Sequence, residues 1–151
     1  MLKVDHVVFP VWDAKASLAF YQEVMGFALV GTASGPDWGG HPWLMMIFSP
    51  GDGREVVLVS LKGAKRPKAS ALARDVQHLA FAETSLAALV KWRRKLQAAD
   101  IEFWEETHGK QKSIYFEDPN GTVLEITAPP SNAAKQTKRA ALATAQRWIA
   151  A

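Results

Sequence analysis

The chain has 151 residues, no cysteine and a formal net charge of +3 at neutral pH. The absence of cysteine excludes disulfides, thiolate catalysis and cysteine-bound zinc, so nitrogen and oxygen are the only donors for a metal. No apolar run reaches the roughly 20 residues of a membrane span, and the first residues lead straight into a predicted strand instead of a signal peptide. We therefore predict a cytoplasmic protein without a membrane partner.

The positive charge comes partly from residues 62–68 and from the C-terminal tail. Aromatic side chains are not interleaved with these charges, as they are in many nucleic-acid-binding surfaces. This pattern favours a solvated linker and tail over a nucleic-acid partner.

An internal repeat organises the elements. The motif His-x-x-Phe opens a predicted strand at His6 and again at His78. Asp13 can cap a first helix that Gly26 ends, and Thr84 or Ser85 can cap a second. The predicted strands after these helices are 27–30, 43–48 and 55–61 in the first copy, and 101–104, 113–116 and 123–127 in the second.

The repeat predicts an α+β fold. We expect two tandem βαβββ modules, residues 1–66 and 74–130, forming one domain over 1–130 with a curved mixed sheet around a metal cleft. The remaining residues, 131–151, form a C-terminal helical tail. Its helix can be capped by Ser131 or Asn132, and its apolar face consists of Leu142, Ala145, Trp148 and Ile149.

Alternation along the strands separates two faces. One face is apolar and needs a helix against it, while the opposite face carries His6, His78, Tyr115 and Glu125. Two imidazoles and one carboxylate are the facial triad that holds a divalent metal and leaves coordination sites open. The alternative is that each is a separately hydrogen-bonded core residue. For the three together we favour a metal site of His6, His78 and Glu125.

The paired pattern, with a histidine in the first strand of each half and a glutamate in the last strand, resembles the vicinal oxygen chelate superfamily over about residues 3–128. That group includes glyoxalase I, extradiol dioxygenases, fosfomycin-modifying thiol transferases, methylmalonyl-CoA epimerases and metal-free bleomycin-binding proteins. The resemblance implies a small-molecule ligand, but a fold alone does not choose the reaction.

Departures from the family pattern narrow the choice. Glyoxalase I and the epimerases use a fourth metal ligand where this chain offers Leu58 or Val59, and the nearest carboxylate, Glu55, lies at the strand entrance. The fosfomycin transferases place a hydroxyl and a lysine where this chain has Val8 and Glu105. The missing fourth ligand leaves the three-ligand arrangement, which the extradiol dioxygenases share with the fosfomycin transferases, and the second pair of departures favours the dioxygenases.

Residues 108–125 are similar to the extradiol dioxygenase signature, apart from Glu106 at its opening position. The resemblance assigns His108 and Tyr115 to hydrogen bonds with a metal-bound catecholate. It implies Fe(II) as the cofactor, although the same ligands accept Mn(II), Zn(II) or Ni(II). The alternatives are an exposed loop histidine and a core tyrosine with a satisfied hydroxyl.

The family's separate acid/base histidine has no clear counterpart, and His41 is the only candidate. It lies in a predicted Gly- and Trp-rich loop, residues 32–43, in which Trp38, His41 and Trp43 could close over a substrate. A plain surface loop is the alternative.

We predict a metal-dependent enzyme that acts on a small substrate with two neighbouring oxygens, most simply an extradiol-type dioxygenase. The alternatives are a glyoxalase-like isomerase or lyase, a fosfomycin-type thiol transferase, and a metal-free bleomycin-resistance-like binding protein that stacks a flat ligand on Trp38 and Trp43. We also expect a homodimer, because short members of the superfamily often pair and build each cleft from two chains.

Overall fold

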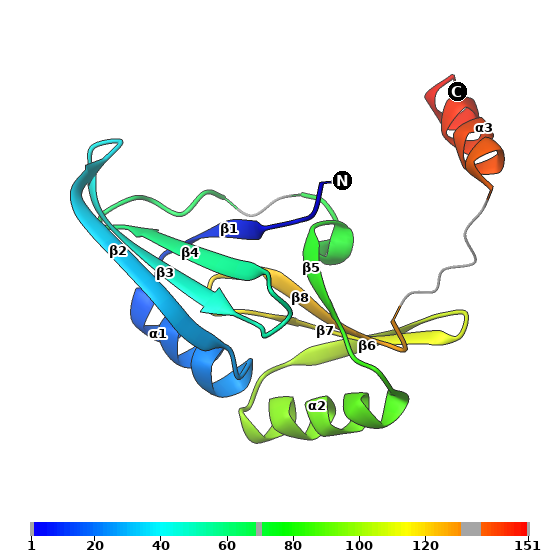
Figure 1. The fold of residues 1–151 in the computed structure, drawn as a ribbon, viewed down its shortest axis with the longest axis horizontal. Helices are drawn as coiled ribbons and strands as arrows, with labels where there is room; N and C mark the ends of the chain where they lie inside the picture. Colours follow the sequence, from blue (N-terminus) through cyan, green and yellow to red (C-terminus); the bar gives the residue numbers. More distant parts are fainter. Residues whose placement is uncertain (1, 69–70, 131–136, 151) are drawn as a thin grey trace.

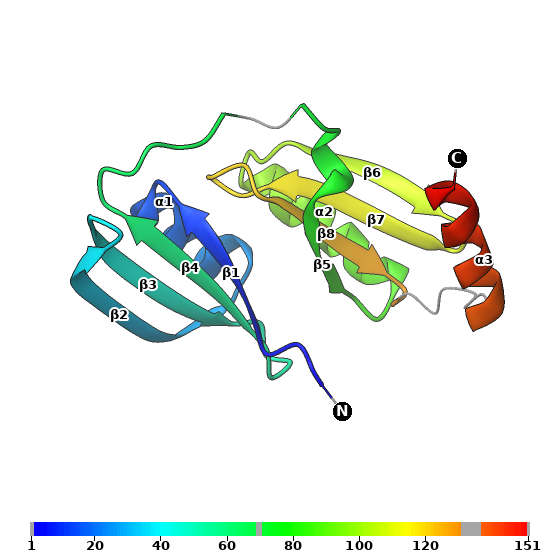
Figure 2. The ribbon, with the colours of Figure 1, turned by 90° about the horizontal axis from the view of Figure 1, so that it is seen from above.

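The computed structural model describes residues 2–68, 71–130 and 137–150. It contains two four-stranded mixed sheets, with strand orders β1-β4-β3-β2 and β5-β8-β7-β6. Figure 2 shows the two sheets side by side, and Figure 1 shows the C-terminal helix at one side of the molecule. The predicted α+β class and tandem βαβββ organisation are confirmed, although in a single chain the eight strands form two sheets and not one continuous sheet.

The first sheet comes from the first repeat. Its strands are β1 (His6–Val11), β2 (Ala28–Trp38), β3 (His41–Ser49) and β4 (Glu55–Leu61). β1 runs parallel to β4, and the other neighbours are antiparallel. As predicted, Asp13 caps α1 (Ala14–Ala19), and its carboxylate accepts a hydrogen bond from the backbone N–H of Ala16. The helix then continues over Phe20–Val24 as a π-helical segment.

The second sheet repeats this design. Its strands are β5 (His78–Ala82), β6 (Phe103–His108), β7 (Gln111–Glu117) and β8 (Val123–Ala128), with β5 parallel to β8. A short 3₁₀ helix, Arg74–Val76, leads into β5, and Ser85 caps α2 (Leu86–Ala98) through its hydroxyl. β1 and β5 each form one edge of their sheet.

The prediction of an irregular loop over residues 32–43 is wrong. β2 continues to Trp38 and pairs with β3, so this segment is a hairpin that turns at Gly39 and Gly40. Both turn glycines have positive φ, which suits a tight connection between two strands. The strand pairing satisfies backbone groups that a loop would expose to water.

The two modules share one hydrophobic core on the faces opposite His6 and His78. Its largest fully buried apolar side chains come from the π-helical segment, from α2 and from both sheets: Tyr21, Phe48, Leu58, Leu96, Ile114, Phe116, Leu124 and Ile126. Polar contacts add to this core. The buried Asn120, in the β7–β8 turn, accepts from the backbone N–H of Trp12 at 2.8 Å and donates to the Ser17 hydroxyl at 2.8 Å.

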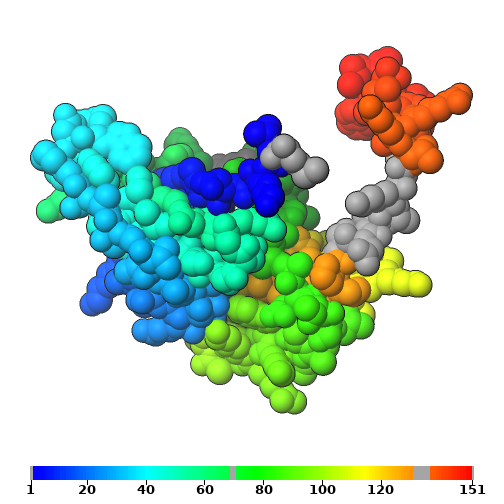
Figure 3. Space-filling model, in the orientation of Figure 1, coloured from blue at the N-terminus to red at the C-terminus, as the bar shows by residue number. Residues whose placement is uncertain are grey.

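The predicted tail helix exists as α3 (Lys138–Ile149), capped by Thr137. The predicted caps Ser131 and Asn132 lie outside the described residues. α3 stands away from the two sheets (Figure 1, Figure 3), and none of its residues is buried. Across the described part of the chain, no helix has the length and apolar content to cross a membrane.

Candidate metal centre

His78 and Glu125 come together on adjacent strands of the second sheet. Ala80 is the register partner of Glu125, so His78 lies one diagonal step away on the same face. The Nε2 atom of His78 is 2.9 Å from Oε2 of Glu125. The imidazole is about one-third exposed, whereas the carboxylate is buried. This pair combines one nitrogen and one oxygen donor, the types that first-row dications accept.

Hydrogen bonds fix the orientation of both side chains. The Nδ1 atom of His78 is 2.6 Å from the backbone oxygen of Asp75, and this carbonyl can only accept, so Nδ1 carries the proton. On the other side, the Ser113 hydroxyl donates to Oε1 of Glu125 at 2.5 Å.

This hydrogen-bonding pattern fits a metal. With the proton on Nδ1, the lone pair of Nε2 points at a carboxylate oxygen, which is unfavourable unless a second proton or a cation lies between the two atoms. A ligating histidine whose other ring nitrogen donates to a backbone carbonyl is the usual arrangement in metal sites. His78 and Glu125 therefore have the donor chemistry and the support that such a site needs.

Tyr115 and His108 extend this polar face. Tyr115 is the register partner of Glu125, and its ring meets the His78 ring edge-on at 5.6 Å. Its hydroxyl is 3.5 Å from Nε2 of His108, which is also 3.2 Å from a carboxylate oxygen of Glu106. Burial, and after it the negative charge of Glu125, raise the pKa of Tyr115 to about 12, so its hydroxyl remains a donor at neutral pH.

Three further residues of this face were not identified from the sequence. Ser113 bonds Glu125 and also reaches the hydroxyl of Thr127 at 3.0 Å. Trp104 stacks on Tyr115 with ring centroids 5.4 Å apart and an interplanar angle of 15°. Alternation could have found Ser113 and Thr127, which lie two residues from Tyr115 and Glu125. The position of Trp104 depends on the pairing of β6 with β7.

His6 does not join this pair in a single chain. It lies on the edge strand β1, half-exposed, and its Nδ1 atom is 2.8 Å from a carboxylate oxygen of Asp5. Among the residues that the structure describes, no three histidine, aspartate or glutamate side chains are grouped as a metal site. The register partner of His6 on β4 is Glu55, the carboxylate at the entrance of that strand. The structure thus brings together two of the three predicted ligands.

The predicted substrate-binding residues cluster at the other end of the first sheet. Trp38 and Trp43 meet edge to face at 5.4 Å, and the Nδ1 atom of His41 is 3.0 Å from the backbone oxygen of Lys62. Trp43 pairs with the last residue of β4, whereas His6 pairs with the first. In one chain these three residues therefore lie far along the strands from His6.

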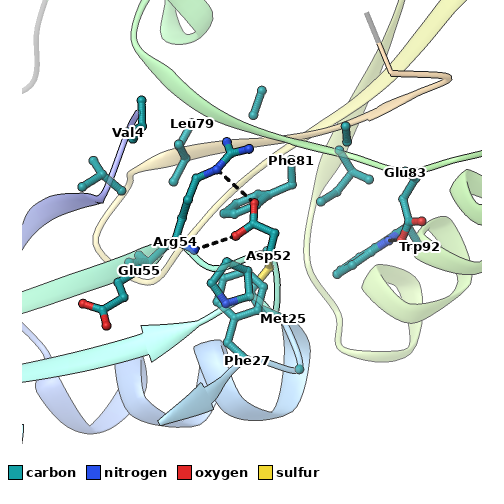
Figure 4. Close-up of a pocket in the computed structure, with 17 residues that line it drawn as sticks. Val4, Met25, Phe27, Asp52, Arg54, Glu55, Leu79, Phe81, Glu83 and Trp92 are labelled. Carbon is teal, nitrogen blue, oxygen red and sulfur yellow. Dashed lines mark hydrogen bonds and ion pairs between the residues drawn. The ribbon is translucent and has the colours of Figure 1, made fainter. Parts of the chain in front are cut away.

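A cavity of about 470 Å³ opens between the modules on the core side. Figure 4 shows Phe27 and Phe81 in its wall, with an ion pair between Asp52 and Arg54 at 3.3 Å beside them. None of His78, Glu125, Tyr115 or His108 lines it. The cavity is therefore separate from the candidate metal centre.

Solved structures with the same fold come from proteins of different activities. A putative dioxygenase from Bacillus subtilis subsp. subtilis str. 168 matches with a TM-score of 0.67 and 20% identity, over 82% of this chain but only 39% of that protein. The chain thus spans well under half of that protein's length. A glyoxalase family protein from Enterococcus faecalis matches with a TM-score of 0.67 and 20% identity, over 83% of this chain and 96% of the other.

A third match is a glutamate-to-glutamine mutant of FosX, a fosfomycin resistance protein from Listeria monocytogenes, in complex with Mn(II) and 1S,2S-dihydroxypropylphosphonic acid. Its TM-score is 0.63 and its identity 17%, over 87% of this chain and 95% of the other. At such identities these structures establish the fold alone. No curated protein matches the chain.

The family model described as Glyoxalase/Bleomycin resistance protein/Dioxygenase superfamily matches residues 3–126. Members of this superfamily are often enzymes and commonly bind divalent metals. The match spans both modules and includes His6, His78, Tyr115 and Glu125. The chain therefore belongs to the Glyoxalase/Bleomycin resistance protein/Dioxygenase superfamily.

Proposed function

We propose that the chain is a metal-dependent enzyme that binds a substrate through two neighbouring oxygens, and that it is an extradiol-type dioxygenase. The observation that carries this proposal is the contact between His78 and Glu125 on the face that also carries Tyr115 and His108. A metal held by two imidazoles and a carboxylate keeps enough open positions for a bidentate substrate. Ferrous iron held there would stabilise the substrate anion and pass electron density from that anion to dioxygen, so that the substrate is the group oxidised.

The side chains around the pair have separate roles. Ser113 holds Oε1 of Glu125, so Oε2, the oxygen that faces His78, would be the one that binds the metal. The neutral hydroxyl of Tyr115 can donate to a substrate oxygen, since burial keeps it protonated. His108, within 3.5 Å of that hydroxyl, can accept or return its proton.

The third ligand, His6, would come from a second copy of the chain. β1 and β5 are both sheet edges, and each carries its histidine on an exposed face. If β1 of one chain lies beside β5 of another, a twofold axis repeats the contact and completes two identical sites. This arrangement would convert two incomplete donor sets into two facial triads, and it requires a homodimer.

Other members of the superfamily suggest different activities. The FosX match, with its Mn(II) and phosphonate ligand, and the glyoxalase family match keep a thiol transferase, an isomerase or a lyase as alternatives. We favour the dioxygenase because His108 and Tyr115 are in contact beside the pair. A metal-free binding protein would not need this buried and hydrogen-bonded Glu125.

The test begins with metal content. Protein purified without chelators should carry about one iron, manganese or zinc per chain. The protein is then reconstituted with Fe(II) without oxygen, mixed with simple catechols and exposed to air, and a yellow ring-cleavage product is expected. Activity toward a thiol or an epoxide without ring cleavage would favour the transferase. A folded protein that takes up no metal would favour the binding protein.

A further inference from the structure

The two sheet faces that carry the proposed ligands differ in chemistry. In the second sheet, the face of His78 and Glu125 is polar, with Ser113, Tyr115 and Thr127 around them. In the first sheet, register and alternation place mainly apolar side chains on the face of His6, with Glu55 at one end and His41 at the other: Val8, Pro10, Trp43, Met45, Ile47, Val57, Val59 and Leu61. A ligand bound between the two faces would therefore meet donors on one side and hydrocarbon on the other.

Neither face offers a cation of its own. Among the eight described strands, Lys112 is the single lysine or arginine, and it alternates with Ser113, so it lies on the opposite face. Arg74 reaches the second face by lying over the Trp104 ring at 4.7 Å. However, its Nε and Nη2 atoms both donate to Glu117, at 3.1 and 2.9 Å.

The charges that do lie on these faces are negative. Glu55 is the register partner of His6, and Glu106 and Glu117 share the face of Tyr115 by their pairing in the second sheet. An anionic group on the ligand would lose hydration here and meet carboxylates without a free cation to pair with. A hydrocarbon group on the ligand would increase the affinity, because binding removes its own apolar surface and that of Val8 from water.

We infer that the site takes a chelating diol with a neutral hydrocarbon substituent, and that it discriminates against diols that carry a carboxylate or phosphonate. This inference rests on the proposed function, because it assumes that a metal joins the two faces. According to this inference, the face of the first sheet that carries His6 determines which substituent the site accepts. The substrate class is then an alkyl- or aryl-substituted catechol or a similar enediol.

Binding can be measured without turnover. Protein loaded with Zn(II) is titrated by calorimetry, without oxygen, with catechol, 4-methylcatechol and 4-ethylcatechol. Because a buried methylene contributes about 0.8 kcal/mol, affinity should rise about fourfold with each added carbon. The second comparison is between 3,4-dihydroxybenzoate and its methyl ester, with each affinity expressed relative to the affinity of the same diol for free Zn(II), because the ester withdraws more electron density from the ring than the carboxylate does. The acid should bind at least about tenfold more weakly than the ester, since its charge is unpaired at the site.

Two variants locate the effect. Val8→Lys adds a cation on the face of His6, at a position that is half-exposed. It should reduce or abolish the preference for the ester over the acid. Val90→Lys, the same change at an exposed position of α2, should leave the preference intact. If Val8→Lys disturbs folding or association, Met45→Ala tests the same face from β3 and should lower the gain per added carbon.

The outcomes separate the two levels of the proposal. If no diol binds in a metal-dependent way, the proposed function fails. If catechol binds with the metal but the acid binds as tightly as its ester, or added carbons bring no gain, the proposed function survives and the substrate class is wrong. The Val8→Lys protein could also fold, bind catechol normally and keep the same preference for the ester over the acid. That result would show that the face of the first sheet does not determine specificity.

Discussion

His78 and Glu125, far apart in the sequence, approach each other to 2.9 Å across the parallel pair β5 and β8. A proton on Nδ1 of His78 leaves its Nε2 lone pair facing a buried carboxylate. Such a contact is a suitable place for a dication, because both atoms then bind the same ion.

The first prediction concerns these two ligands. His78→Ala and Glu125→Gln should each lower metal affinity at least about a hundredfold, since each removes a direct ligand of a site with few ligands. The measurement is metal content after dialysis, with circular dichroism to check folding. His41→Ala should keep its metal, because His41 bonds the backbone of Lys62 at the far end of the other sheet. Full metal content in folded His78→Ala would remove His78 from the site.

A second prediction tests whether two chains share each site. His6→Ala and His78→Ala should both lack metal as homodimers. When the two variants are unfolded together and refolded, about half of the dimers are mixed and carry one intact site, so about a quarter of the wild-type metal content should return. If one chain supplied all three ligands, mixing would restore nothing. A monomeric mass in solution would also contradict the shared site.

The third prediction uses the two tyrosines of the chain, Tyr21 and Tyr115. Burial, together with the nearby Asp118, raises the pKa of Tyr21 well above its ordinary value. The raised folded-state pKa means that its stabilising effect is complete below pH of about 10, the unfolded value, and is lost as the pH rises above it.

The free energy of unfolding should therefore fall above that pH, and the fall should be smaller in Tyr21→Phe. Denaturant titrations at several pH values measure it, while phenolate absorbance follows ionisation directly. In the metal-free protein, Tyr115 should ionise at a pH of about 12. Ionisation of both tyrosines near a pH of about 10 in the folded protein would contradict the burial argument.

A fourth prediction concerns the contact between the modules. Asn120 is buried, and its amide bonds the backbone N–H of Trp12 and the Ser17 hydroxyl. Asn120→Ala should lower the free energy of unfolding by about 2 to 4 kcal/mol, because it leaves buried partners unsatisfied. Gln111→Ala, which removes an exposed 3.4 Å hydrogen bond, should change it by less than about 0.5 kcal/mol. Equal effects would show that the contact adds little stability.

The repeated elements could be predicted from local pattern because each rests on short-range physics. The helix starts at Asp13 and Ser85 depend on a side-chain oxygen and a nearby backbone N–H, and both caps are present. The prediction of an irregular loop over residues 32–43 was wrong. It relied on the glycines and tryptophans of this segment, whereas pairing with β3 extends β2 to Trp38. The glycines form only the turn, and Trp43 covers Gly35, where a side chain would clash.

By itself, the sequence determined which side chains share a face, because residues two apart on a strand point the same way. It thus put His78, Tyr115 and Glu125 on one side, and in the structure they are in contact. Only the tertiary structure decided that His6 lies on a different sheet edge, away from that pair. Alternation carries no information about which edges meet, since that depends on how the two modules pack through their common core.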